Sequence, residues 1–158
     1  FNEIKEIIES DNQFLFYKKF KEISDETVKK AVLSEAISHG SDFMSLTTLF
    51  SIDDKEFLGP QLVMASELNK NDIASELSFF VNNPYYLSKA AEISACQDNL
   101  ELSQKLIKTI DNEWFSSRAI EYGEQVQEAS DISSICINFD YKEPVSGKCE
   151  ALEHLCSY

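Results

Sequence analysis

The chain has 158 residues, and its hydrophobic fraction of 43% excludes a disordered chain, while 4 Gly and 3 Pro are too few for a turn-rich β-sandwich. Its formal net charge is −14 and it has no basic stripe, which argues against direct binding to nucleic acid phosphates or to an anionic membrane. No apolar run approaches the roughly 18 residues that span a bilayer, and no signal peptide is visible, so we expect a cytoplasmic helical protein.

Residues 2–50 carry the signals of two helix pairs. We expect a helix over 2–10, a second helix with Asp11 as its N-cap and a third with Ser24 as its N-cap. The third helix should end at Gly40, which tolerates the left-handed conformation, and Ser41 should cap the fourth. Apolar residues at helical spacing mark the buried faces: Ile4, Ile7, Ile8, Phe14, Leu15, Phe20, Ile23, Val28, Val32, Ile37, Phe43, Leu46 and Leu49.

Three further pairs are predicted up to residue 137. Pro60 and Pro84 open two of the helices, because proline is tolerated in the first helical turn, and Asp111 is a candidate N-cap for another. Residues 138–158 contain a loop with one Pro and one Gly, followed by a short terminal helix over 149–156. We therefore expect two parts, a helical repeat domain over 1–137 and an irregular C-terminal tail over 138–158.

Apolar residues recur at a nearly constant interval. Phe14, Phe43, Ile73, Leu100 and Ala129 follow one another at steps of 29, 30, 27 and 29 residues, and a second apolar residue stands six positions after each. Such spacing is typical of stacked helix-turn-helix units. It predicts an all-α fold of about five stacked antiparallel helix pairs, an α-solenoid. The residues expected to be mostly buried are Phe43, Leu49, Ile73, Phe79, Leu100 and Leu106.

Two segments resemble the helical part of ankyrin repeats. One runs from Ala36 to Gly40 and is followed by Leu46 and Leu49, and the other covers residues 62–66 and is followed by Ile73 and Leu77. The Thr-Pro-Leu-His opening of that family and its Gly-Ala-Asp-x-Asn turn are absent. The chain thus resembles a degenerate ankyrin-like or generic αα-solenoid repeat. The resemblance implies protein binding through the concave face or the edges between repeats.

Residues that could carry chemistry form no recognisable site. Cys96 and Cys136 fit ordinary buried thiols, while Cys149 and Cys156 lie near His154 without the close Cys spacing of a zinc knuckle. Reduced thiols and a disulfide involving Cys149 or Cys156 are both open. No phosphate-binding glycine loop occurs. We therefore expect no catalytic residues, no metal, no cofactor and no enzymatic activity.

The acidic surface has two interpretations, a solvated face and a binding site for a cationic partner. We expect a protein–protein interaction module whose partner is another protein. The alternative is an acidic regulator or inhibitor that occupies a basic, for example nucleic-acid-binding, surface of its partner, and a helical enzyme with an unrecognised site ranks third. The candidate partner-binding residues are the acids and aromatics at predicted helix starts: Asp53, Asp54, Tyr86, Asp111, Glu113 and Trp114.

Overall fold

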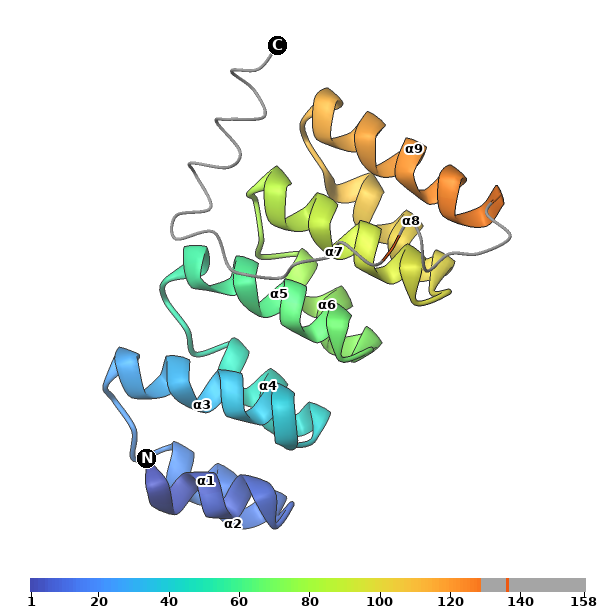
Figure 1. Cartoon of the computed structure of the whole chain (residues 1–158). Helices are drawn as coiled ribbons and strands as arrows, with labels where there is room; N and C mark the ends of the chain where they lie inside the picture. Colours follow the sequence, from blue (N-terminus) through green and yellow to red (C-terminus); the bar gives the residue numbers. More distant parts are fainter. Residues whose placement is uncertain (129–135, 137–158) are drawn as a thin grey trace. The chain divides into compact units, whose positions relative to one another are not determined.

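The computed structural model describes residues 1–128 and 136. In these residues it contains α-helices and one 3₁₀ helix and no strand (Figure 1). The predicted all-α architecture of packed helix pairs is thus confirmed. The elements are α1 (Asn2–Glu9), α2 (Gln13–Phe20), α3 (Glu26–His39), α4 (Asp42–Leu49), η1 (Lys55–Phe57), α5 (Leu58–Glu67), α6 (Asn71–Ser78), α7 (Pro84–Cys96), α8 (Leu100–Thr109) and α9 (Glu113–Glu128).

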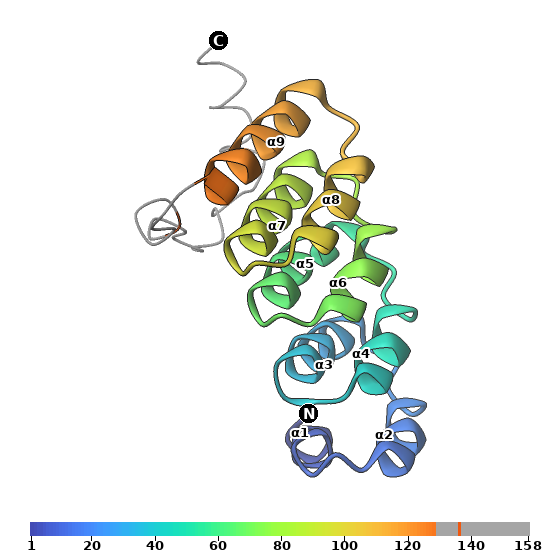
Figure 2. The ribbon, with the colours of Figure 1, turned by 90° about the vertical axis from the view of Figure 1, so that its right-hand side faces the viewer.

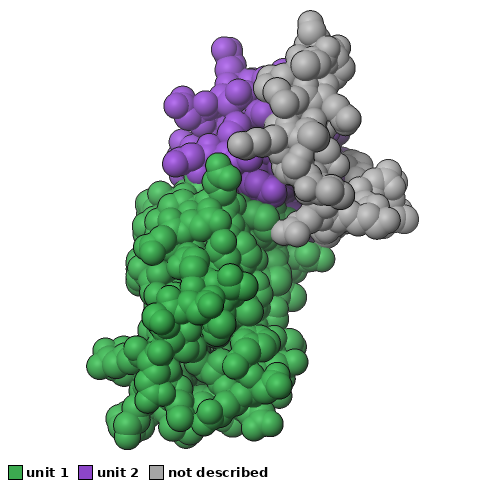
Figure 3. Space-filling model, turned by 90° about the vertical axis from the view of Figure 1, so that its left-hand side faces the viewer, with its two compact units in different colours: residues 1–81 green, residues 82–158 purple. Residues whose placement is uncertain are grey.

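The chain forms two compact units, Phe1–Val81 (unit 1) and Asn82–Tyr158 (unit 2), which Figure 3 colours separately. In unit 1 the pairs α1–α2, α3–α4 and α5–α6 pack against one another. The first helices α1, α3 and α5 form one layer and the second helices α2, α4 and α6 form the other (Figure 2). In unit 2, α7 packs against both α8 and α9. The expected second helix of the fifth pair and the expected tail over 138–158 lie outside the described residues.

The turn inside each pair recurs at an interval of 29 residues. Asp11, Asn69 and Asp98 hold this place with left-handed φ values of 55°, 61° and 59°, a conformation that Asp and Asn tolerate better than most residues. Gly40 holds the same place with φ −101° and ψ −173°, so its predicted left-handed conformation is wrong. Close packing explains the glycine instead, because a Cβ there would lie 2.9 Å from the Ala36 carbonyl oxygen.

The N-cap of each second helix follows this turn residue by one position. Asn12, Ser41 and Asn99 each accept a hydrogen bond from the backbone N–H three residues later, which satisfies one of the helix's unpaired donors. Lys70 takes the same place without a side-chain cap. The prediction for Ser41 is confirmed, whereas the predicted cap at Asp11 is wrong by one residue, because Asp11 forms the turn.

Asp and Asn caps also recur at 29-residue intervals before α3, η1, α7 and α9. Asp25, Asp54, Asn83 and Asn112 accept hydrogen bonds from backbone N–H groups of the first turn that follows. Asn83 followed by proline at the first helical position is confirmed as a helix start. The predicted caps Ser24 and Asp111 are each wrong by one residue, since Asp25 and Asn112 accept the bonds.

The observed caps define the register of the core. Leu49, Ile73 and Leu106 are buried as predicted. Leu100 is half-buried, and the burial predicted for Phe43 and Phe79 is wrong, because 43% and 64% of these residues are exposed. The predicted repeat contained steps of 30 and 27 residues, whereas the caps recur every 29 residues, so the predicted residues do not all lie on one helix face. Phe43 is the second residue after its N-cap, and Ile73 is the third. One residue turns the side chain by about 100° around a helix.

Candidate protein-binding surface

Unit 1 exposes five aromatic residues on its layer of second helices. We call Phe14, Tyr17, Phe43, Phe50 and Phe79 the aromatic surface. Their exposed fractions range from 43% at Phe43 to 78% at Phe14. Large exposed apolar patches are uncommon on soluble proteins and mark sites of interaction.

The repeat register brings these residues to one face. Phe43 and Phe50 lie seven residues apart, which is close to two turns of α4, so their side chains leave the helix on the same side. Phe14 stands at the place of Phe43 on α2, and Phe79 stands at the place of Phe50 at the end of α6. Since α2 packs on α4 and α4 packs on α6, the three helices present one continuous face.

Ring contacts join the neighbouring helices across this face. The ring centroids of Tyr17 and Phe43 lie 6.4 Å apart, and those of Phe50 and Phe80 lie 6.0 Å apart in an edge-to-face arrangement. Cations lie over two of the rings: Lys21 Nζ is 4.5 Å from the Tyr17 centroid and Lys55 Nζ is 5.0 Å from the Phe80 centroid. Such contacts fix the exposed rings in place before any partner binds.

Charged residues of opposite sign flank the aromatic surface. Lys18 and Lys21 are exposed on and just after α2, at one side of the layer. At the other side, on α6, Asp72 is exposed and Glu76 is half-buried. On the central helix α4, the place of Lys18 and Glu76 is taken by the neutral Thr47. The face therefore carries lysines along α2 and carboxylates along α6, with Lys55 beside the Phe50–Phe80 pair.

The second helix of unit 2 shows that the fold itself does not require aromatics at these places. In α8 the residues equivalent to Phe43 and Phe50 are Glu101 and Lys108, and both are exposed. A repeat with the same caps and the same buried positions thus forms with charged residues there. The fold itself therefore does not account for the phenylalanines at these places in unit 1.

The predicted acidic pair Asp53–Asp54 lies in unit 1, at the start of η1. Its contacts join η1 to α3. The Asp54 carboxylate caps η1 and forms an ion pair with Lys30 at 2.7 Å, and its hydrogen bond with Lys30 lowers the pKa of Asp54. The backbone N–H groups of Asp53 and Asp54 donate to Glu26 Oε1 at 2.9 and 3.2 Å. These contacts account for Asp54 structurally, while the Asp53 side chain is exposed.

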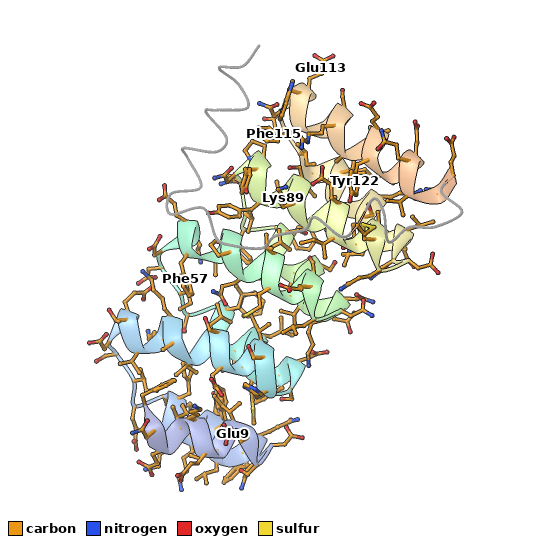
Figure 4. The ribbon with its side chains drawn as sticks, viewed as in Figure 1. Glu9, Phe57, Lys89, Glu113, Phe115 and Tyr122 are labelled. Atoms are coloured by element: carbon orange, nitrogen blue, oxygen red, sulfur yellow. A yellow bond between two sulfur atoms is a disulfide. The ribbon has the colours of Figure 1, made fainter. Side chains whose placement is uncertain are left out.

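The other predicted binding residues lie in unit 2, at the starts of α7 and α9. Tyr86 is half-buried against the Tyr85 ring, at a centroid distance of 5.3 Å. Trp114 is half-buried between Phe115 at 4.7 Å and the Arg118 guanidinium at 5.4 Å. Asp111 and Glu113 are exposed beside these rings, and Glu113 points outward from the start of α9 (Figure 4).

A buried carboxylate in unit 2 was not anticipated from the sequence. Glu92 of α7 is only 3% exposed, and its oxygens lie 3.8 Å from Lys89 Nζ and 3.6 Å from Arg118 Nε. Burial raises the pKa of Glu92, and the two cations partly oppose this. Burial, together with the Glu92 charge, raises the pKa of Tyr122 to about 12. Figure 4 shows Lys89 on α7 and Tyr122 on α9. The position follows from helix packing, so no local sequence signal could have revealed it.

The expectation that Cys96 and Cys136 are free thiols is wrong. The structure joins these residues in a disulfide across a sequence separation of 40 residues, with Cys96 Sγ 3.4 Å from the Tyr122 hydroxyl. Cys149, His154 and Cys156 lie outside the described residues. Within the described part of the chain, no cluster of three or more His, Cys, Asp or Glu side chains could hold a metal ion.

Comparisons of the chain with protein-family models, curated proteins and solved structures found no match. Among the described residues, no helix is both long enough and apolar enough to cross a membrane.

Proposed function

We propose that this chain is a protein–protein interaction module that binds its partner through the aromatic surface of unit 1. One observation carries the proposal: the five exposed aromatics lie on adjacent second helices, and α8 of unit 2 has the charged Glu101 and Lys108 at the places of the four phenylalanines. Aromatic side chains supply large apolar area with few rotatable bonds, and they are enriched among the residues that dominate binding energy.

The strength of such a site comes from removing rings from water. Fully burying an exposed phenylalanine side chain contributes about 1.5–3 kcal/mol. The four phenylalanines of the aromatic surface are partly buried already, so each contributes less than this toward offsetting an association cost of roughly 4–15 kcal/mol. The flanking lysines and carboxylates then select the orientation of the partner. This is the division of roles between an apolar centre and a charged rim that protein interfaces show.

The acidic regulator remains the second candidate, and the net charge of −14 is the observation that favours it. In that case the partner is basic, and the exposed Asp53, Asp111 and Glu113 are its contacts. The two candidates differ in their response to salt, since a complex held by charge weakens steeply as ionic strength rises and a complex centred on aromatic rings does not. No residue of the described part supplies a reason to prefer an enzyme.

The cytoplasmic location stays a prediction, and the Cys96–Cys136 disulfide weighs against it. Structural disulfides are rare in the reducing cytosol and persist in oxidising compartments. Measuring the free thiols of the protein isolated from its native cells decides this point.

The proposal is tested by comparing which proteins co-purify with three forms of the tagged chain from its native cells. The first is the wild type, the second is Phe43→Ser/Phe50→Ser and the third is Glu101→Ser/Lys108→Ser, which alters the equivalent places in unit 2. We expect quantitative mass spectrometry to find partners that the second form loses and the third form retains. Identical sets of partners for all three forms contradict the proposal. Circular dichroism verifies that the variants stay helical.

A further inference from the structure

We propose that the groove between α8 and α9 in unit 2 binds a short amphipathic helix of another protein, which packs there as a second helix packs on its first helix in the repeats. The inference goes beyond the proposed function, because it concerns a second surface on the other unit. It is drawn from the equivalent places of α3, α5, α7 and α9 and from the position of Cys136.

The helix α9 presents the face that a first helix turns toward its second helix. The Ser103 hydroxyl on α8 donates to the Ala91 carbonyl on α7 at 2.8 Å, which identifies this face on α7. Counted from the caps, Ile120, Gly123 and Glu124 hold the corresponding places on α9. The residues at these places in the three earlier first helices are all buried: Leu33, Ala36 and Ile37 on α3, Leu62, Ala65 and Ser66 on α5, and Ala91, Ser94 and Ala95 on α7.

On α9 this face stays partly open, as far as the structure describes the chain. Ile120 is 45% exposed, and a Cβ at Gly123 would meet nothing within 4 Å. The helices α8 and α9 lie side by side (Figure 2) and border a groove of about 420 Å³, whose apolar residues are Leu100, Ile107 and Ile120. Because a glycine lies within it, the backbone of a bound helix can approach α9 closely.

The disulfide keeps Cys136 away from this groove. Since the caps recur every 29 residues, the repeat assigns Cys136 the place that Ile107 holds on α8. That place lies roughly 12 Å along the helix from its N-cap. Cys96, in contrast, is the last residue of α7, at the turn into α8, and its Cα lies 5.9 Å from the Cys136 Cα. With the disulfide formed, Cys136 therefore does not take its place in the groove, and a helix from another protein can enter.

The repeats define the helix that fits. Each second helix turns an apolar residue, a small or polar residue next to it and a further buried residue one turn later toward its first helix. These residues are Met44, Ser45 and Thr48 on α4, Ile73, Ala74 and Leu77 on α6, and Leu102, Ser103 and Leu106 on α8. A partner helix with this pattern sets its small residue opposite Ile120, as Ser103 lies opposite Ala91.

Charges along the groove favour one direction of the bound helix. Lys108 lies near the end of α8, beside the start of α9, whereas Glu124 and Glu128 are exposed toward the end of α9. A helix has partial positive charge at its N-terminus and partial negative charge at its C-terminus. A bound helix antiparallel to α9 therefore sets its N-terminus beside the two glutamates and its C-terminus beside Lys108. This is also the direction that α8 takes against α7.

The test uses a peptide with the sequence of residues 70–80 of this chain, which includes α6 and carries the pattern as Ile73, Ala74 and Leu77. The exchange Asp72→Lys allows a lactam bridge to Glu76, one helical turn away, which holds the peptide helical. Calorimetric titration of the disulfide-bonded wild type should show binding of one peptide with a Kd below about 1 mM. The peptide with Ile73→Ser/Leu77→Ser should bind about tenfold or more weakly, because it loses both apolar contacts.

Protein variants locate the bound peptide. Gly123→Leu fills the groove and should weaken binding about tenfold or more, and Ile120→Ser, which removes an apolar contact at a partly exposed place, should weaken it about threefold or more. Glu121→Leu adds the same side chain as Gly123→Leu at another, exposed side of α9. This control should bind the peptide as the wild type does, and so should Phe43→Ser/Phe50→Ser on the aromatic surface.

Three results overturn the inference. The first is the absence of binding at about 1 mM peptide. The second is equal binding by the wild type, Gly123→Leu and Ile120→Ser, because the peptide then binds elsewhere. The third is self-association of the wild type in sedimentation equilibrium that Gly123→Leu abolishes, which assigns the groove to a second copy of this chain. None of them touches the proposed function, since the co-purification experiment tests the aromatic surface through Phe43→Ser/Phe50→Ser.

Discussion

Tyr17 on α2 and Phe43 on α4 are both exposed, yet their ring centroids lie only 6.4 Å apart, so two helices of unit 1 share an aromatic contact on their solvent side. In most helical repeats the apolar side chains of a second helix lie in the core and its outer side is polar. Here the core positions are occupied as usual, and the aromatic residues come in addition to them. The contact therefore marks a surface with a role outside the folding of unit 1.

The exposed and the buried apolar residues of α4 should differ sharply in their effect on stability. Replacing Leu49 by Ala leaves a cavity and should reduce the free energy of unfolding by about 2–5 kcal/mol. Replacing the exposed Phe43 by Ser should change it by less than about 0.5–1 kcal/mol. Urea unfolding measures both changes. Equal losses for the two variants mean that the register of α4 is wrong.

Replacement by alanine should change the stability of the protein in opposite directions at two of its glycines. A Cβ at Gly40 would lie 2.9 Å from the Ala36 carbonyl oxygen, 3.0 Å from Ile8 Cγ2 and 3.1 Å from Met44 Sδ. Gly40→Ala should therefore destabilise unit 1 by about 1–3 kcal/mol through overpacking. Gly123 lies inside α9 and a Cβ there meets nothing within 4 Å. Gly123→Ala should stabilise the protein by about 0.5–1 kcal/mol, because alanine is the better helix former.

Thermal unfolding of the two glycine variants beside the wild type is the measurement. A Gly40→Ala protein as stable as the wild type shows that the α3–α4 turn relaxes without cost. A Gly123→Ala protein less stable than the wild type contradicts the open space beside Gly123.

The disulfide should contribute substantially to the stability of unit 2. It connects Cys96 with Cys136 across a separation of 40 residues, and closing a loop of that length restricts the unfolded chain by about 3–4 kcal/mol in the chain-entropy account. Reducing the protein with a dithiol should therefore lower its Tm. The Cys96→Ser/Cys136→Ser variant should show the lower Tm already and should not respond to the reductant. A wild type whose Tm is the same with and without reductant contradicts the pairing.

Glu92 should make stability depend on pH in a defined direction. Burial raises its folded pKa above the ordinary value of 4.5 that the unfolded chain has. Between these two pKa values the folded state binds more protons than the unfolded state, so the contribution of Glu92 is fully present below pH 4.5 and is lost as pH rises through the folded pKa. Replacing Glu92 by Gln removes this loss.

The prediction is checked by urea unfolding of the wild type and Glu92→Gln between about pH 4 and pH 8. The stability of Glu92→Gln relative to the wild type should increase as pH rises through this range. A relative stability that falls toward pH 8 means that the ion pairs with Lys89 and Arg118 outweigh the burial of the carboxylate. Glu121→Gln, at an exposed position of α9, is the matched control for the loss of one carboxylate.

Local features of the sequence determined the helices, because their signals act within a few residues. Ser41 and the Asn83-Pro84 pair begin helices as predicted, since a cap needs only its own backbone N–H partners. The repeat of about 29 residues was also readable, because each pair of helices needs the same number of residues to turn and return. These local signals are therefore sufficient to predict an all-α fold of packed helix pairs.

The tertiary structure decided which side of each helix faces inward. Phe43 and Met44 are adjacent and both apolar, and only the packing of α4 against its neighbours buries Met44 and exposes Phe43. The disulfide partner of Cys96 and the Arg118 partner of Glu92 were likewise unpredictable, because they come from segments more than twenty residues away that helix packing brings close. Burial and pairing across helices depend on contacts distant in the chain, and those contacts place on the surface of unit 1 the aromatic residues that helical periodicity assigns to the core.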